Sequence, residues 1–146
     1  MGAFTGEPIA SKTCAMKIFF DGGCRPNPGR MEAAAVAAGK TYYAGDLGLG
    51  SSHKAEWLAL FHAIEVARAL GERRIVLLGD SAALVDQVNG RSRPRDAEVS
   101  GFVARLREEV LPFDGVRVRH VPRTQNLAGI ALAKMRENAQ ATTAAS

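Results

Sequence analysis

The stretch Ile18-Phe-Phe-Asp-Gly-Gly-Cys-Arg-Pro-Asn-Pro-Gly29 runs from three apolar residues directly into a turn rich in glycine and proline. The apolar residues predict a short buried strand, and the residues that follow predict a tight turn. Asp21 lies at the junction between the two. A carboxylate in such an apolar setting is costly unless a partner stabilises its charge, so its position calls for a chemical explanation.

The residues downstream predict a regular succession of strands and helices. Residues 31–39 and 41–47 read as two further strands that turn near Gly39-Lys40. After them we expect a buried helix from Ser51 or Ser52 to about Leu70, a strand at 74–78, helices at 81–88 and 96–110, a strand at 116–121 and a helix at 125–138. This order predicts an α/β fold whose five-stranded mixed sheet has three antiparallel strands, then two parallel strands, and helices on both faces.

Two more carboxylates lie in settings like that of Asp21. Glu56 is in the first turns of the buried helix, and Asp80 ends the strand at 74–78. Each of the three has an ordinary explanation on its own, since Asp favours turns and Glu favours helix starts. Three that converge in one topology are better explained by a hard cation bound through oxygen ligands.

Four segments resemble the motifs of type 1 ribonucleases H, in the family's order and spacing. The segments are Asp21–Gly29, Ser51–Glu56, Leu78–Gly90 and Val121–Ala133, and the likeness covers roughly residues 16–138. The chain lacks the family's long basic insertion, as one branch of the family does. The resemblance therefore implies the ribonuclease H-like fold, with the same element order as the one read from the sequence.

The resemblance also implies an activity, hydrolysis of the RNA strand of an RNA–DNA hybrid with two Mg²⁺ ions, for which Mn²⁺ can substitute. By position, Asp21 would bridge the ions, and Glu56 and Asp80 would hold the ion at the leaving group. Family contacts to the hybrid, which involve 2′-hydroxyls in the minor groove, would fall on Cys24, Asn27, Ser52 and His53.

The fourth motif departs from the family at one position. The family has a metal-binding aspartate four residues after the asparagine, and counting on from Asn126 gives Ile130, which cannot bind Mg²⁺. Glu137 is too far along the helix to replace it, and the cation Lys134 would compete with a metal. The loss would fall on the ion that activates water. We expect Ile130→Asp to restore that ion's position unless Ile130 is packed in the core.

Basic residues near the expected nucleic-acid path are candidates for phosphate contact. They are Arg91, Arg93 and Arg95 in one loop, and Arg123 in the short loop before the last helix. His120 lies in a strand of alternating residues on its apolar side, which favours a structural role over a catalytic one.

Composition and length limit the remaining possibilities. The 146 residues carry 47% hydrophobic and 23% charged residues and a net charge of +4, typical of one globular domain with a polyanionic partner. We expect tails at 1–15 and 139–146 around a domain at 16–138. Without an apolar run of membrane-spanning length or a secretory signal, and with two unpaired cysteines, the sequence favours a cytoplasmic monomer.

Two main functions and one minor one remain open from the sequence. The chain is either a hybrid-specific endonuclease, with activity reduced by Ile130, or a module of the same fold that binds hybrid or RNA without cutting it. Another nuclease of the wider fold, such as a transposase or an exonuclease, is disfavoured by the Asn27-Pro28-Gly29 turn and by the spacing from Glu56 to Asp80.

Overall fold

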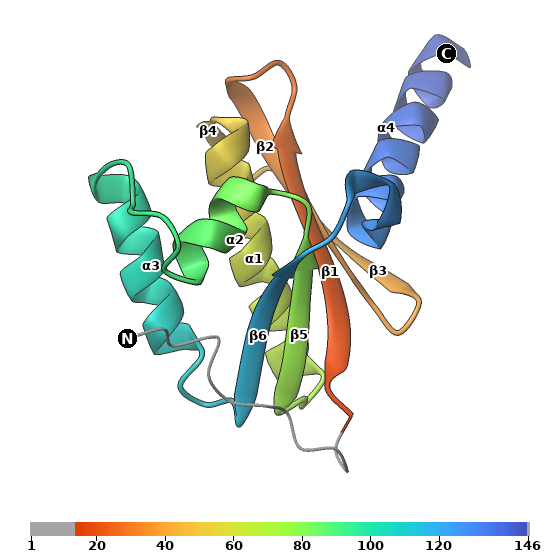
Figure 1. The fold of residues 1–146 in the computed structure, drawn as a ribbon. Coiled ribbons are helices and arrows are strands. Elements are labelled where there is room, and N and C mark those ends of the chain that lie inside the picture. The colour runs from red at the N-terminus through yellow and green to blue at the C-terminus, as the bar shows by residue number, and fades with distance from the viewer. Residues whose placement is uncertain (1–13, 146) are drawn as a thin grey trace.

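The structure, a computed structural model, describes residues 14–145, with side chains described as far as residue 139. The elements in chain order are β1 (Met16–Cys24), β2 (Gly29–Ala37), β3 (Lys40–Ala44), β4 (Leu49–Gly50), α1 (Ser52–Ala69), β5 (Arg74–Gly79), α2 (Ala82–Val88), α3 (Ala97–Glu109), β6 (Gly115–His120), a 3₁₀ turn (Arg123–Gln125) and α4 (Leu127–Ala145) (Figure 1). None of the helices within the described residues is long and apolar enough to cross a membrane.

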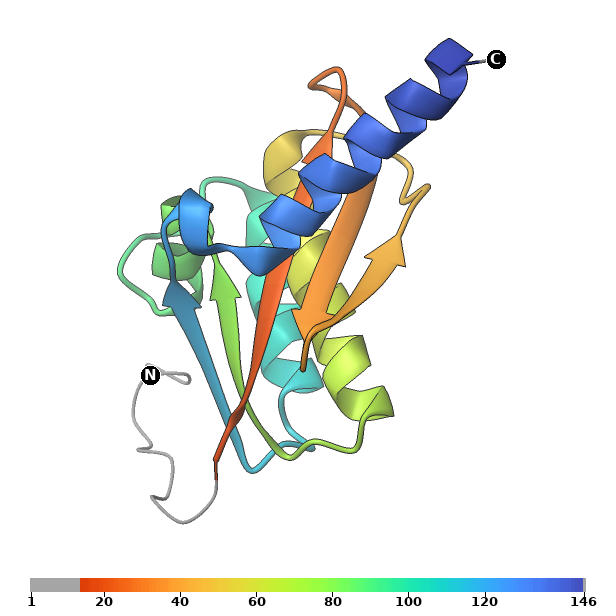
Figure 2. The same ribbon diagram turned by 90° about the vertical axis from the view of Figure 1, so that its right-hand side faces the viewer.

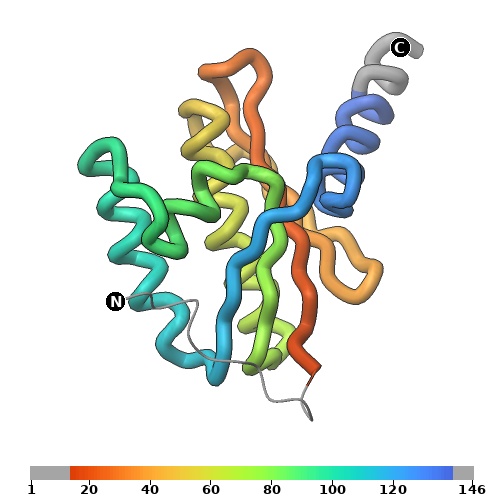
Figure 3. The backbone as a smooth tube through the Cα atoms, in the orientation of Figure 1, coloured from red at the N-terminus to blue at the C-terminus, as the bar shows by residue number. Residues whose placement is uncertain are grey.

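The sheet has the predicted mixed topology. Its strand order is β3-β2-β1-β5-β6, in which β1, β2 and β3 are antiparallel and β5 and β6 run parallel to β1. The chain path in Figure 3 shows β1 at the centre, with β2 and β3 on one side and β5 and β6 on the other. The expected five strands are confirmed, and a sixth, the two-residue β4, pairs with β2.

Helices cover both faces of the sheet, also as predicted. α1 packs on β1 and β2, with α2 and α3 on the same side, while α4 crosses the opposite face over β1 and β2 (Figure 2). Trp57 of α1 is fully buried and stacks on Phe102 of α3 at 5.5 Å between ring centroids. β2 is rich in buried alanine, and small side chains in a central strand let helices approach closely from both faces.

The turn between β2 and β3 lies one residue earlier than expected. Ala38 and Gly39 both have positive φ, 51° and 76°, and β2 ends at Ala37. Two consecutive positive φ values make the kind of two-residue turn that matches the right-handed twist of paired strands. Glycine at position 39 marks the turn in the sequence, whereas the positive φ of Ala38 has no such local marker.

The C-terminal helix is longer than expected. We predicted a helix over 125–138 and a tail over 139–146, but α4 runs from Leu127 to Ala145. Residues 139–145 contain no glycine or proline and are rich in alanine, so no residue there stops the helix. The predicted N-terminal tail lies outside the described residues, except for Cys14 and Ala15, which precede β1.

Candidate metal centre and nucleic-acid interface

The structure brings the three predicted carboxylates together from three elements. Asp21 lies within β1, which does not end there as expected but continues to Cys24. Glu56 is in the second turn of α1, and Asp80 directly follows β5, the parallel neighbour of β1. One carboxylate oxygen from each residue lies within 4.8 Å of the others. This distance and this donor type fit a single hard divalent cation bound by oxygen ligands.

The close approach of β1 and α1 aims Glu56 at the strand. The backbone N–H of Gly22 donates to Oε1 of Glu56 at 3.3 Å. A Cβ atom at position 22 would lie 2.1 Å from the carbonyl oxygen of Ala55, so only glycine fits there. The glycine after Asp21 is therefore a packing requirement of the site.

Asn126 holds Asp80 in place from the fourth motif. Its side chain is fully buried, and its Nδ2 donates both to the Phe20 carbonyl oxygen at 3.0 Å and to Oδ2 of Asp80 at 2.9 Å. Its Oδ1 accepts the N–H of Ala128 in the first turn of α4. One amide thus ties β1, Asp80 and the start of α4 together.

The environment favours the protonated form of two of the carboxylates when no metal is bound. Burial, the charge of Asp80 and, least, that of Glu32 raise the pKa of Asp21 to about 6, against the opposing charges of Arg136 and Arg123. Burial, followed by the charges of Asp21 and Asp80, raises the pKa of Glu56 to about 8. A divalent cation would remove this repulsion, as expected for a metal centre.

The carboxylates lie in an open pocket of about 550 Å³ that also holds half of the residues predicted to contact nucleic acid. The pocket is lined, among others, by Cys24, Ser52, His53 and Arg123. Asn27 borders this group, since its Nδ2 donates to Oγ of Ser52 at 2.9 Å and its Oδ1 accepts the Ser52 N–H at 3.1 Å. The turn after β1 and the start of α1 therefore form one polar surface beside the carboxylates.

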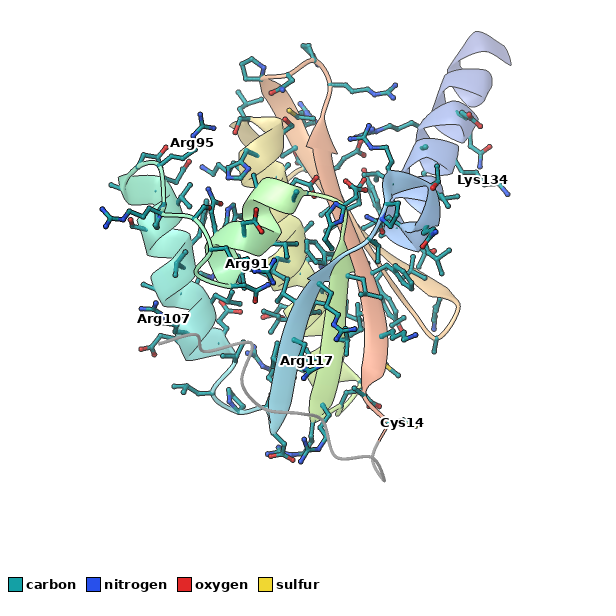
Figure 4. All side chains as sticks on the ribbon, viewed as in Figure 1. Cys14, Arg91, Arg95, Arg107, Arg117 and Lys134 are labelled. Atoms are coloured by element: carbon teal, nitrogen blue, oxygen red, sulfur yellow. The ribbon has the colours of Figure 1, made fainter. Side chains whose placement is uncertain are left out.

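The arginine loop lies outside this pocket. Arg91 pairs with Asp86 at 3.3 Å, and Arg91, Arg93 and Arg95 are all exposed. Figure 4 places Arg95 beside the start of α3, at the end of the molecule where β5 and β6 terminate. Phosphate contact by these three residues stays a prediction.

The start of α4 lies against the carboxylates, as the fourth motif implied. Gly129, Ile130, Ala133 and Arg136 line the pocket. The Ile130 side chain is 49% exposed, so it is not a core residue. Lys134, which we expected to oppose a metal, is exposed and points away from the sheet (Figure 4).

Sequence reasoning missed several groups beside the carboxylates, namely Glu32, Arg136 and the buried amide of Asn126. Gly129, Ala133 and Arg136 have the spacing of one helix face, which could have revealed the arginine.

His120 was expected on the apolar side of its strand and was given a structural role. It is the exposed last residue of β6 and does not line the pocket.

Comparison with known proteins identifies the family. A family model described as reverse transcriptase-like matches residues 19–136, which is most of the chain. The chain belongs to the ribonuclease H-like family. The ribonuclease HI of Halobacterium salinarum is 34% identical over 120 residues, which are 79% of this chain and 60% of that protein. The ribonuclease H-like chain thus spans about 60% of the length of this curated relative.

Solved structures agree with the fold of this ribonuclease H-like chain. The crystal structure of RNase H1 from Halobacterium salinarum superposes with a TM-score of 0.73 at 32% identity, over 82% of this chain and 94% of that one. The N-terminal RNase H domain of a Mycobacterium tuberculosis protein has a TM-score of 0.71 at 24% identity, over 87% and 99%. LC11-RNase H1 in complex with an RNA/DNA hybrid has a TM-score of 0.67 at 21% identity, over 77% and 88%.

Proposed function

We propose that this protein is a metal-dependent endonuclease that hydrolyses the RNA strand of RNA–DNA hybrids. The observation that carries the proposal is the cluster of Asp21, Glu56 and Asp80, whose oxygens lie within 4.8 Å of one another in an open pocket. The likeness of this chain to the ribonuclease HI of Halobacterium salinarum supports the choice of reaction. All three carboxylates come from one chain, which supports action as a monomer.

Mg²⁺ is the metal we propose, with Mn²⁺ as a substitute. Both ions prefer carboxylate and water oxygens, which matches a donor set made of carboxylates alone. A bound ion would supply Lewis-acid activation of water and of the scissile phosphate. The protein's own part is to orient the carboxylates, through the Gly22 N–H at Glu56 and the Asn126 amide at Asp80.

The surface beside the carboxylates supports a hybrid as the substrate. Polar side chains lie at and beside the pocket, from Asn27, Ser52 and His53. The guanidinium of Arg123 adds a positive charge to the lining. Hydroxyl, amide and imidazole groups can pair with the 2′-hydroxyls that distinguish RNA from DNA. LC11-RNase H1, which shares the fold, was solved in complex with an RNA/DNA hybrid.

The test is a cleavage assay on a hybrid with a labelled RNA strand, run with Mg²⁺ and separately with Mn²⁺. We expect internal RNA fragments with 5′-phosphate and 3′-hydroxyl ends, an intact DNA strand, and no cleavage of double-stranded DNA. Asp80→Asn should abolish cleavage while the variant still binds hybrid, because the amide keeps the side chain's shape but is a poor ligand.

A second candidate function, binding of hybrid or RNA without cleavage, is favoured by one observation. Ile130 presents a half-exposed apolar side chain at the pocket, where the resemblance implies a carboxylate. Tight hybrid binding with no cut in either metal at high protein concentration would establish this function and refute the nuclease.

A further inference from the structure

A partly buried ion pair borders the pocket on the side of α4. Nε of Arg136 donates to Oε2 of Glu32 at 2.5 Å, and the two side chains are only 21% and 20% exposed. The hydroxyl of Tyr43 donates to the other oxygen of Glu32 at 2.9 Å. Glu32 is therefore held from two sides, and it fixes the position of the guanidinium.

The guanidinium end of this pair faces the carboxylates. Arg136 lines the same pocket as Asp21, and its Nη2 atom is buried without a hydrogen-bond partner. At Gly23, two residues after Asp21, a Cβ atom would lie 2.8 Å from that nitrogen. The absence of a side chain at position 23 is what lets the guanidinium reach this place.

The positive end of the pair is the end that lies toward Asp21. Arg136 lines the pocket together with Asp21, whereas Glu32 does not line it. The guanidinium reaches the β1 backbone at Gly23, and positions 21 and 23 of a strand point to the same face. The guanidinium therefore compensates the carboxylate cluster from the Asp21 side.

Among the described residues, α4 offers no anionic ligand to the pocket. The residues that it contributes to the lining are Gly129, Ile130, Ala133 and Arg136, of which only the arginine is charged. A second divalent cation on this side would find no carboxylate on α4 and would face a fixed positive charge, and both conditions oppose its binding.

We propose that Arg136, held by Glu32, supplies the second positive charge of this centre, so that the pocket binds one divalent cation at Asp21, Glu56 and Asp80. Arg136 is then a positioning residue that compensates Asp21 and keeps a second ion out. The inference rests on the proposed function for its role in catalysis, but the number of bound ions can be measured without a substrate.

This arrangement changes what is expected of the substitution at Ile130. Ile130→Asp alone adds a ligand beside a guanidinium that still repels a cation, so it should not create a full second site. The new carboxylate should bind a second cation only when the charges of the Glu32–Arg136 pair are also removed. Ile130→Asp and removal of that pair should together create a second metal site that neither change creates alone.

The experiment is a Mn²⁺ titration of the full chain by calorimetry and electron paramagnetic resonance, without nucleic acid. We expect one bound ion in the natural protein and in Ile130→Asp, and two in Ile130→Asp combined with Glu32→Gln and Arg136→Met. The double change Glu32→Gln with Arg136→Met should still bind one ion, about tenfold more tightly, since a nearby positive charge is gone. Arg107→Met, far from the pocket on α3 (Figure 4), should change nothing.

A second variant protects the test against a failure to fold. Gly23→Ala should displace the guanidinium by contact without removing either charge, and it should also tighten the first ion. Two ions of similar affinity in the natural protein would overturn the inference, as would unchanged affinity and ion number in every folded variant. Hybrid cleavage is scored separately. One bound ion, with a second admitted only by the combined substitutions, but no cleavage would refute only the nuclease. Cleavage by a natural protein that binds two ions would refute only this inference.

Discussion

At the scale of single residues, a bound metal would compete with protons for the same carboxylates. Asp21 and Glu56 have pKa values raised to about 6 and about 8, mainly by burial. Such groups stabilise the metal-free fold fully only below their ordinary pKa near 4. That stability is lost as the pH rises through the raised values, because the unfolded chain ionises more easily than the folded one.

Glu56→Gln should therefore stabilise the metal-free protein at alkaline pH. At pH 8–9 in EDTA we expect a gain of about 1–3 kcal/mol, or roughly 3–10 °C in melting temperature, which shrinks toward pH 5. Thermal melts across this pH range measure it. Glu108→Gln, on the exposed side of α3, is the control and should show no such trend. A loss of stability in Glu56→Gln at pH 9 would contradict the raised pKa.

Asn126 should matter for both folding and metal binding. Asn126→Ala removes the donor to Asp80 and Phe20 and leaves buried polar groups unpaired, which should cost about 2–4 kcal/mol and weaken Mn²⁺ binding. Asn89→Ala is the matched control, since its Nδ2 donates to the Val118 carbonyl oxygen outside the pocket. Urea unfolding and metal titration should show that Asn89→Ala loses stability but keeps its metal affinity. Unchanged metal affinity in Asn126→Ala would show that Asn126 does not position Asp80 for the metal.

At the scale of elements, the contact between β1 and α1 sets the geometry of the centre. The first turn of α1 is anchored by Ser51, whose side chain accepts the N–H of Lys54. β1 passes the same turn so closely that Gly22 touches the Ala55 carbonyl group. The distance from Asp21 to Glu56 thus depends on a backbone contact.

Gly22→Ala should break that contact. Both atoms in the clash belong to backbone or Cβ and cannot rotate away, so we expect a loss of about 3 kcal/mol or more and loss of the high-affinity metal site. The same substitution at Gly101, in α3 with no atom within 4 Å of an added Cβ, should instead stabilise by about 0.5–1 kcal/mol. Urea unfolding of both variants checks the opposite signs; a Gly22→Ala variant as stable as the natural protein would contradict the packing.

At the scale of the whole molecule, charge is distributed unevenly around the site. The carboxylates occupy the pocket, while the chain as a whole carries a net charge of +4. In the proposed reaction, cations around the pocket would hold the polyanion while its scissile phosphate approaches the acidic centre through a bound metal. The exposed arginine loop after α2 is the largest such group of cations predicted from the sequence.

Changing Arg91, Arg93 and Arg95 together to Ala should weaken hybrid binding and reduce its salt dependence. Each lost phosphate contact lowers the slope of log affinity against log salt by up to about 0.9. Binding should be measured in EDTA, where no cleavage occurs, at several salt concentrations. Arg107→Ala, near the far end of α3, is the control (Figure 4). An unchanged slope in the triple variant would place the loop away from the nucleic acid.

The sequence by itself determined the element order, the mixed sheet and the three carboxylates, because these follow from local signals. Apolar runs mark buried strands, Ser51 and Gly71 mark the ends of α1, and single acids stand out against apolar neighbours. The β2–β3 turn and the end of α4 differ from the bounds expected from the sequence. Turn type and helix ends depend on neighbours that a local pattern does not include.

Only the tertiary structure decided what surrounds the carboxylates. The amide of Asn126 meets Asp80 from 46 residues away, and Arg136 meets Glu32 from 104 residues away. No local pattern marks such pairs, because they form when α4 is laid across the sheet. The fold likewise left Ile130 half-exposed at the pocket and turned Lys134 away from it. Helix orientation decides which side chain enters the site, and packing against the sheet sets that orientation.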